Sequence, residues 1–135
     1  MNKFMIEGTE FTPEIILDID TRKFSFTGVS RPEDVVKFYQ PTINWLKELD
    51  LEMTNHSNFK YIIPSINIVF HLSYFNSSSS KMLLQLLELI KKIQSRGIEI
   101  VIEWYYDESD EQMYDDGLDL SESVDLPFNF HCVKN

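Results

Sequence analysis

The chain has 135 residues, of which 43% are hydrophobic and 13% aromatic. This length and composition predict one packed domain over residues 1–135 and exclude an intrinsically disordered chain. Twelve basic against 22 acidic residues give a formal net charge of -10, which opposes binding to a nucleic-acid backbone, so we expect no nucleic-acid partner.

The first part of the chain is predicted to form a meander of strands followed by a helix. The strands are expected over Phe4–Ile6, Ile15–Asp20 and Phe24–Thr27. The helix is predicted to begin at the Ser-x-x-Glu capping box of Ser30 and Glu33, and Pro41 is expected to kink it or split it in two. The polar segment Asp50–Lys60 is predicted to be a loop.

The central part of the chain has the pattern of strand, helix and strand. Residues Ile66–Phe75 alternate as in a largely buried strand, and apolar residues recur at helical spacing over Leu83–Ile93. A β-prone run over Ile98–Tyr106 follows, and such a right-handed crossover makes the two strands parallel. With an edge strand over Phe128–Cys132, we predict an α/β domain with a mixed sheet of about four to six strands and two main helices on one face.

Four consecutive serines, Ser77–Ser80, follow Asn76 where the strand pattern ends and the helix pattern begins. They are predicted to cover the N-cap and the first helical turn, where unpaired N–H groups and the helix dipole stabilise an anion such as phosphate. Serine is also a preferred N-cap residue, so capping alone is a second explanation. The residues leave both interpretations open.

The segment between Arg96 and Lys134 contains no Lys or Arg. Within it, the stretch Asp107–Asp125 carries Asp107, Glu108, Asp110, Glu111, Asp115, Asp116, Asp119, Glu122 and Asp125. A calcium loop beginning at Asp107 would place Gln112 at the required glycine and Leu118 at the closing glutamate, so the loop motif fails. We therefore predict no metal and no cofactor. We assign the acidic segment Asp107–Asp125 to docking of a basic protein, with apolar area supplied by neighbouring aromatic residues. These are Trp104, Tyr105, Tyr106 and Tyr114.

No catalytic constellation is visible in the sequence. A serine nucleophile would need a base, and His71, the histidine nearest to Ser77, lies roughly 20 Å away along a strand. A Gly-x-Ser-x-Gly elbow, Gly-rich phosphate loops and dinucleotide fingerprints are absent. We expect a protein that is not an enzyme. The alternative is a small-molecule-binding, anion-binding or hydrolytic domain that uses the Asn76–Ser80 loop.

The expected location is the cytoplasm. Residues 1–7 lack the apolar core and cleavage site of a signal peptide, and no run approaches the roughly 20 apolar residues that span a bilayer. The single cysteine, Cys132, excludes an internal disulfide and is consistent with a reducing compartment.

Four motifs follow one another over almost the whole chain. They are Gly8-Thr9-x-x-Thr12-Pro13-Glu14-Ile15, Phe38-Tyr39-x-Pro41-x-x-x-Trp45-Leu46, Tyr74-Phe75-Asn76-Ser77-Ser78-Ser79-Ser80-Lys81 and Trp104-Tyr105-Tyr106-Asp107-x-x-Asp110-Glu111-x-Met113. In this order they resemble the SiaC family of bacterial regulatory phosphoproteins. The resemblance implies a fold like that of STAS domains of the anti-anti-sigma type, in which a strand-to-helix loop carries the phosphorylated Ser or Thr.

The resemblance also implies partners and a regulatory cycle. A Ser/Thr kinase of the histidine-kinase-like ATPase type adds the phosphate, a PP2C-like phosphatase removes it, and the unmodified protein binds an effector. In the best-known branch the effector is a diguanylate cyclase, which connects the family to cyclic-di-GMP signalling.

Carried onto this chain, the family's acceptor is Ser77, with Ser78 as the next candidate. Serine replaces the more common threonine and keeps the hydroxyl. Asn76 stands where anti-anti-sigma proteins often have aspartate, and its side chain is expected to hold the loop by a local hydrogen bond. The other residues assigned to the loop and to partner binding are Ser79, Ser80, Lys81, Trp104, Tyr105, Tyr106, Asp107, Asp110 and Glu111.

Overall fold

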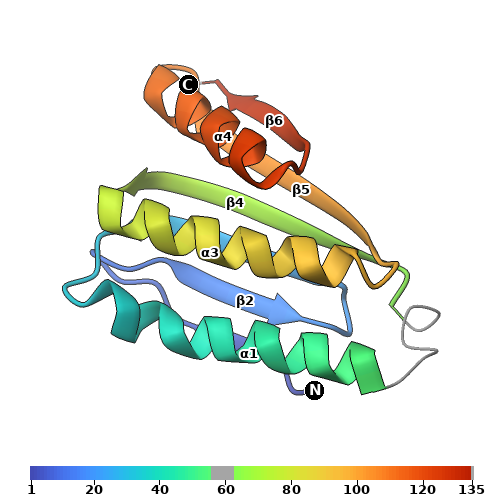
Figure 1. Ribbon diagram of the computed structural model, residues 1–135. Coiled ribbons are helices and arrows are strands. Elements are labelled where there is room, and N and C mark those ends of the chain that lie inside the picture. Colours follow the sequence, from blue (N-terminus) through green and yellow to red (C-terminus); the bar gives the residue numbers. More distant parts are fainter. Residues whose placement is uncertain (56–62, 135) are drawn as a thin grey trace.

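The computed structural model describes residues 1–55 and 63–134, which form six strands and three helices (Figure 1). In chain order these are β1 (Phe4–Ile6), β2 (Glu14–Asp18), β3 (Lys23–Ser30), α1 (Val35–Asn55), β4 (Ser65–Phe75), α3 (Ser77–Gln94), β5 (Glu99–Asp107), α4 (Glu111–Val124) and β6 (Phe128–Val133). The predicted strands are all present, with ends that differ by a few residues. Among the described residues, no helix combines the length and apolar character needed to cross a membrane.

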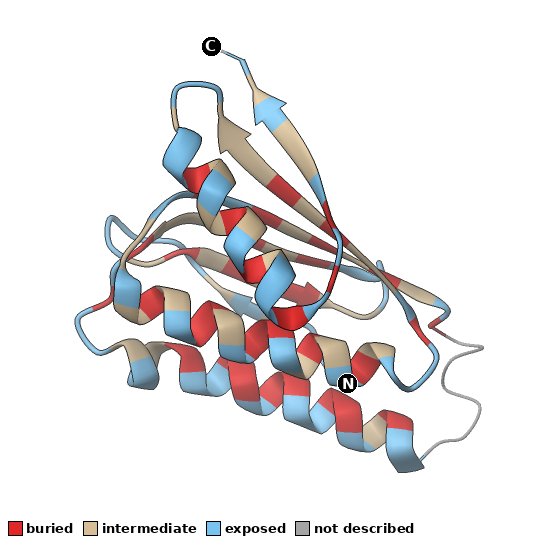
Figure 2. Cartoon of the chain, turned by 45° about the horizontal axis from the view of Figure 1, so that its top comes forward, coloured by how far each residue is buried: buried red, intermediate tan, exposed pale blue. Residues whose placement is uncertain are grey.

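The strands lie in the sheet in the order of the chain, from β1 to β6. β1, β2 and β3 pair antiparallel as the predicted meander, whereas β3, β4, β5 and β6 are parallel neighbours. Three right-handed crossovers that advance in one direction must place their helices on the same face. Figures 1 and 2 show α1, α3 and α4 on that face. The mixed α/β sheet is confirmed, but it carries three helices rather than the predicted two.

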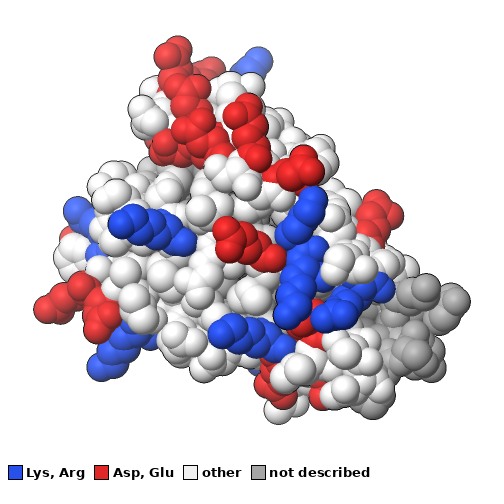
Figure 3. Space-filling view, in the orientation of Figure 1, with Lys and Arg blue, Asp and Glu red and all other residues white. Residues whose placement is uncertain are grey.

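The third helix, α4, lies in the segment that the sequence analysis described only as acidic. Its buried residues are Met113, Gly117, Leu120 and Val124, which recur at helical spacing on one side. Figure 3 shows Asp and Glu gathered over α4, while most Lys and Arg on this face lie over α1 and α3. The apolar stripe is narrow, one of its positions is a glycine, and acidic residues surround it. The sequence pattern therefore does not predict this helix.

Trp104 lies in the core between the sheet and α4, and its indole is only 1% exposed. The ring stacks on Phe128 with centroids 5.6 Å apart, lies 5.6 Å from the ring of Phe70, and donates its Nε1 hydrogen to the carbonyl of Met113 at 3.0 Å. The assignment of Trp104 to a partner-binding surface is therefore wrong. A large aromatic ring with one satisfied donor stabilises the fold most when it is fully buried.

Helix α1 begins later than its predicted capping box. Asp34 caps the helix instead, because its Oδ1 accepts from the N–H of Lys37 at 3.1 Å and its carbonyl accepts from the N–H of Phe38 at 3.0 Å. Ser30 is the last residue of β3 and is fully buried. The local Ser-x-x-Glu pattern was therefore misread, since the strand continues to the serine.

Pro41 lies inside α1 without splitting it. Buried residues on both sides of the proline, including Tyr39, Ile43 and Leu46, hold the two parts of the helix against the sheet and offset the missing backbone hydrogen bond. The helix continues to Asn55. The predicted loop over Asp50–Lys60 is therefore wrong for residues 50–55, and its remainder, 56–60, lies outside the described residues.

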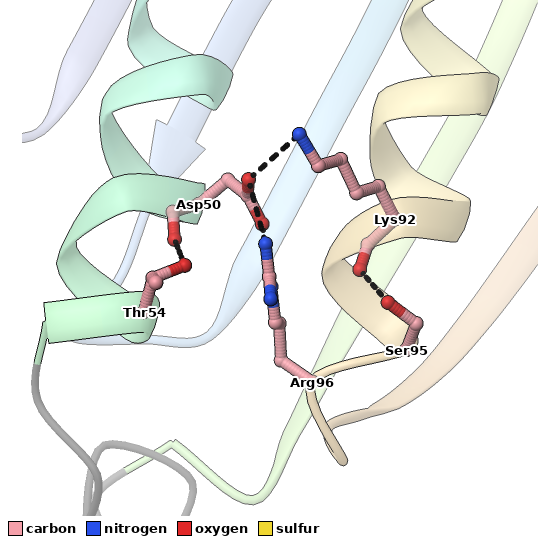
Figure 4. A network of polar contacts seen from close by, with 5 residues as sticks. All are labelled: Asp50, Thr54, Lys92, Ser95 and Arg96. Carbon is pink, nitrogen blue, oxygen red and sulfur yellow. Dashed lines mark hydrogen bonds and ion pairs between the residues drawn. The ribbon is translucent and has the colours of Figure 1, made fainter.

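Asp50 joins the C-terminal parts of α1 and α3 (Figure 4). Its buried carboxylate accepts hydrogen bonds from Nε and Nη2 of Arg96 at 3.1 and 3.4 Å and lies 3.3 Å from Nζ of Lys92. Burial raises the pKa of Asp50, but the hydrogen bonds and charges of Arg96 and Lys92 outweigh it and hold this pKa below its usual value.

Replacing Asp50 with asparagine should lower the melting temperature near neutral pH by several degrees. It should also make the melting temperature fall less steeply as the pH is lowered. Because the folded pKa lies below the unfolded value of about 3.9, the stabilisation is complete above that value and is lost as the pH falls through the folded pKa. Thermal unfolding followed by circular dichroism between about pH 6 and pH 2 measures the effect. Glu48→Gln, at an exposed position of the same helix, is the control. If the melting temperature of Asp50→Asn varied with pH as that of the wild type does, the Asp50 carboxylate would not be the source of this stabilisation.

Candidate functional site

The junction of β4 and α3 forms the serine turn, which we define as Asn76–Ser80. Asn76 is the N-cap of α3, with extended backbone at φ -89 and ψ 175. Its Oδ1 accepts from the N–H of Ser79 and its carbonyl accepts from the N–H of Ser80, each at 2.9 Å. The expected local hydrogen bond of the Asn76 side chain is thus observed, and it fixes the first turn of the helix.

The four serines of the turn differ in exposure. Ser77 is exposed, Ser78 and Ser80 are half-buried, and Ser79 is fully buried. The Ser78 hydroxyl donates to Asn76 Oδ1 at 3.0 Å, and the Ser79 hydroxyl donates to the carbonyl of Ser30 at 2.9 Å. Ser77 is therefore the hydroxyl of the four that an enzyme can approach most freely. Ser79 lies in the interior, so its assignment to partner binding is wrong.

Hollows lie on both sides of the serine turn. Ser77 lines one of about 400 Å³, together with Lys81 of α3 and Asp116 of α4. A smaller hollow of about 190 Å³ between α3 and α4 is also lined by Lys81 and Asp116. Ser78 instead lines an open hollow of about 1060 Å³ near the start of α1. The turn is therefore flanked by α1 on one side and by the acidic helix α4 on the other.

The electrostatic surroundings of Ser77 contain opposing influences on an added anion. The capping bonds of Asn76 engage the N–H groups of Ser79 and Ser80, so helix geometry leaves the N–H groups of Ser77 and Ser78 directed at the N-terminus. These groups and the helix dipole favour a negative charge on Ser77. Lys81 adds a cation to the same hollow, whereas Asp116 adds a carboxylate. A phosphate is locally stabilised by α3 and repelled by α4.

The acidic residues assigned to docking have different structural roles. Asp107 Oδ1 accepts from the N–H and the hydroxyl of Ser109 at 2.9 and 2.7 Å, and Asp110 caps α4 by accepting from the N–H of Met113 at 3.0 Å. Glu111, in the first turn of α4, is exposed. The further exposed carboxylates of the segment are Glu108, Asp115, Asp119, Glu122 and Asp125. Over residues 1–55 and 63–134, no three or more His, Cys, Asp or Glu residues gather in a way that could hold a metal ion.

Tyr105 and Tyr106 point to opposite faces of the sheet because side chains alternate along β5. The ring of Tyr106 packs 5.0 Å from that of Tyr114 on the helix side. The ring of Tyr105 lies on the other face, stacked between His71 at 5.2 Å and His131 at 4.6 Å. The two tyrosines therefore do not share one partner surface with α4.

Both described histidines lie on the sheet face opposite the helices, where they stack on Tyr105. Neither is placed to take a proton from Ser77 at the start of α3. His56 lies outside the described residues. A hydrolytic use of the serine turn would need its base from elsewhere.

The comparisons with known proteins bear on the family and the fold of the chain. The family model for the SiaC family regulatory phosphoprotein matches residues 6–133. The chain belongs to the SiaC family. The resemblance drawn from the four sequence motifs is thus confirmed.

Relatives in sequence and structure are similar over nearly their whole lengths. An uncharacterized protein of Pseudomonas aeruginosa (strain UCBPP-PA14) is 24% identical over 128 residues, covering 95% of this chain and 94% of that protein. The crystal structure of apo-SiaC from Pseudomonas aeruginosa has a TM-score of 0.81 at 23% identity, covering 97% of this chain and 99% of that chain. SiaC bound to the diguanylate cyclase SiaD, whose activator it is, gives a TM-score of 0.81 at 23% identity, with 96% and 99% covered. These likenesses confirm the SiaC fold.

Proposed function

We propose that this SiaC-family chain is a non-catalytic switch protein that is phosphorylated on Ser77. The observation that carries the proposal is the exposure of Ser77 at the capped start of α3, while the other three serines are half-buried or buried. In the reaction, Ser77 Oγ attacks the γ-phosphorus of ATP, ADP leaves, and a base of the kinase takes the hydroxyl proton. The chain itself supplies only the acceptor hydroxyl and holds it exposed at the start of α3.

The unmodified form binds an effector and the modified form releases it. A phosphate adds about -1.5 to -2 charges at a turn that shares its hollow with Asp116, on a chain of formal charge -10. A surface that packs against the neutral turn would then meet repulsion and a desolvation cost. Since a solved relative is in complex with a diguanylate cyclase, we take such a cyclase as the effector class.

Two further enzymes complete the proposed cycle. A Ser/Thr kinase of the histidine-kinase-like ATPase type modifies Ser77, and a PP2C-like phosphatase restores the hydroxyl. Exposure of Ser77 supports both steps, because each enzyme must bring its own catalytic groups to the same oxygen.

The acidic helix α4 is proposed as the part of the chain that attracts its partners. Its exposed carboxylates include Asp115 and Asp119, and Asp119 lines a hollow that Ser80 of the serine turn also lines. Figure 3 shows Asp and Glu gathered over this helix. A basic patch on the effector would be steered to the carboxylates of α4, and this would bring a neighbouring uncharged part of the effector over Ser77. Glu111 belongs to the same surface.

Anion binding without phosphorylation is the second candidate function, favoured by the presence of Lys81 in the hollow beside Ser77. Under this alternative the purified protein retains a small phosphate-containing molecule. Native mass spectrometry of the purified protein distinguishes a dissociable ligand from a covalent phosphate.

Phosphosite mapping tests the acceptor directly. Protein from its native host, or protein treated with its kinase and ATP, should carry one phosphoryl group on Ser77, measured by intact mass and peptide sequencing. Ser77→Ala should lose this modification. Ser78→Ala, which removes a neighbouring half-buried hydroxyl, should keep it. Efficient labelling of Ser77→Ala on Ser78 or Ser80 would overturn the assignment.

A further inference from the structure

A chain of buried hydroxyl groups connects the serine turn to α1 and to the end of β3. Ser30, Tyr39 and Ser79, which are far apart in sequence, are each 0% exposed. Ser79 Oγ lies 2.9 Å from the carbonyl oxygen of Ser30 and 2.9 Å from Ser30 Oγ. Ser30 Oγ in turn lies 2.5 Å from the hydroxyl of Tyr39.

The direction of these hydrogen bonds follows from the number of protons. Each hydroxyl has one hydrogen to donate, and that of Ser79 goes to the Ser30 carbonyl while that of Ser30 goes to Ser79 Oγ. Tyr39 must therefore donate to Ser30 Oγ. Burial raises the pKa of Tyr39 to about 12, so this phenol keeps its proton at physiological pH.

The Ser30 carbonyl holds the serine turn at two points on either side of Ser77. It accepts from the Ser79 hydroxyl at 2.9 Å and from the backbone N–H of Asn76 at 3.2 Å. In an α-helix, residues two apart point about 200° away from each other, so a Ser79 side chain fixed inward directs Ser77 outward. The inward bond of Ser79 and the exposure of Ser77 are thus two consequences of one arrangement.

We propose that Tyr39, Ser30 and Ser79 are positioning residues that select Ser77 as the phosphoacceptor. This inference rests on the proposed function above. The three buried side chains set the rotation of the first turn of α3. When the hydroxyl chain is broken, the turn loosens, Ser77 is presented less well, and the neighbouring half-buried serines Ser78 and Ser80 become competing acceptors.

Tyr39→Phe and Ser79→Ala test the proposal, because each removes one hydroxyl and no hydrocarbon. Each should lower kcat/KM for phosphorylation by the kinase by up to about 10-fold, the factor that corresponds to one neutral hydrogen bond. Each should also move a measurable share of the phosphate from Ser77 to Ser78 or Ser80 in peptide mapping. Tyr74→Phe, which removes the hydroxyl of an exposed tyrosine on β4, is the matched control and should change neither quantity.

The share of phosphate on each serine is the decisive readout, since a general loss of stability would lower the rate without changing the acceptor. All variants are assayed well below their melting temperatures. An unchanged rate and an unchanged site distribution in Tyr39→Phe would overturn the inference while Ser77 remains the acceptor in the wild type. Absence of Ser77 phosphate in the wild type would overturn the proposed function itself. If Ser79→Ala does not fold, Tyr39→Phe decides alone, because it keeps the buried ring.

Discussion

Replacement of Ser77 by glutamate should weaken binding of the effector by about 10- to 100-fold without unfolding the chain. The carboxylate lies in the first turn of α3, where the N–H groups and the helix dipole tolerate a negative charge, so the fold is retained. The same charge faces Asp116 across a shared hollow and adds to the acidic surface of α4. An effector that packs over the neutral turn must then bury a charge that it has no group to neutralise.

Isothermal titration of the effector's binding region, with circular dichroism of each variant, measures this effect. Gln85→Glu, an equal change of charge at an exposed position further along α3, should bind nearly as well as the wild type. Raising the ionic strength should narrow the gap between Ser77→Glu and the wild type, because exposed charges are screened. Enzymatically phosphorylated protein, which carries the true dianion, should bind more weakly still. Equal affinity of the phosphorylated and unmodified proteins would exclude an electrostatic switch at Ser77.

The serine turn could be located from the sequence because its signals are local. The alternation of β4 ends at Phe75, and the asparagine and four serines that follow are residue types that often cap the start of a helix. What the sequence could not show is which serine faces solvent. That depends on Ser30, which is hydrogen-bonded to Ser79 49 residues away, and on Tyr39, which is hydrogen-bonded to Ser30. Tertiary packing sets both contacts.

The errors in the sequence analysis have the same physical origin. Ser30 has the sequence context of a helix cap, but the parallel pairing of β3 with β4 extends the strand to this residue. Trp104 is of a residue type enriched at protein interfaces, yet the alternation of β5 directs its side chain inward beneath α4. In both cases the local sequence pattern has a recognised meaning, but contacts with residues far away in the sequence decide the structure instead.

Replacement of Gly117 by alanine should displace α4 and lower the stability of the fold. An added Cβ would lie 2.5 Å from Trp104 Nε1 and 2.8 Å from Cδ1 and Cε2 of the same ring. The indole cannot yield, because it is stacked on Phe128, lies against Phe70 and is hydrogen-bonded to the carbonyl of Met113. The helix must therefore move away from the sheet. Overpacking of this kind costs about 1–3 kcal/mol, and the better helix propensity of alanine offsets about 1 kcal/mol of it.

Thermal unfolding together with near-ultraviolet circular dichroism, which reports on the packing of Trp104, measures the consequence of Gly117→Ala. We expect a melting temperature several degrees below that of the wild type and an altered aromatic signal. Ser123→Ala gains helix propensity at an exposed position of α4 and should be as stable as the wild type or slightly more so. Since α4 brings Asp116 into the hollow beside Ser77, the Gly117 variant should also lose affinity for the effector. A melting temperature for Gly117→Ala at or above that of Ser123→Ala would show that the contact with Trp104 does not limit how closely α4 packs.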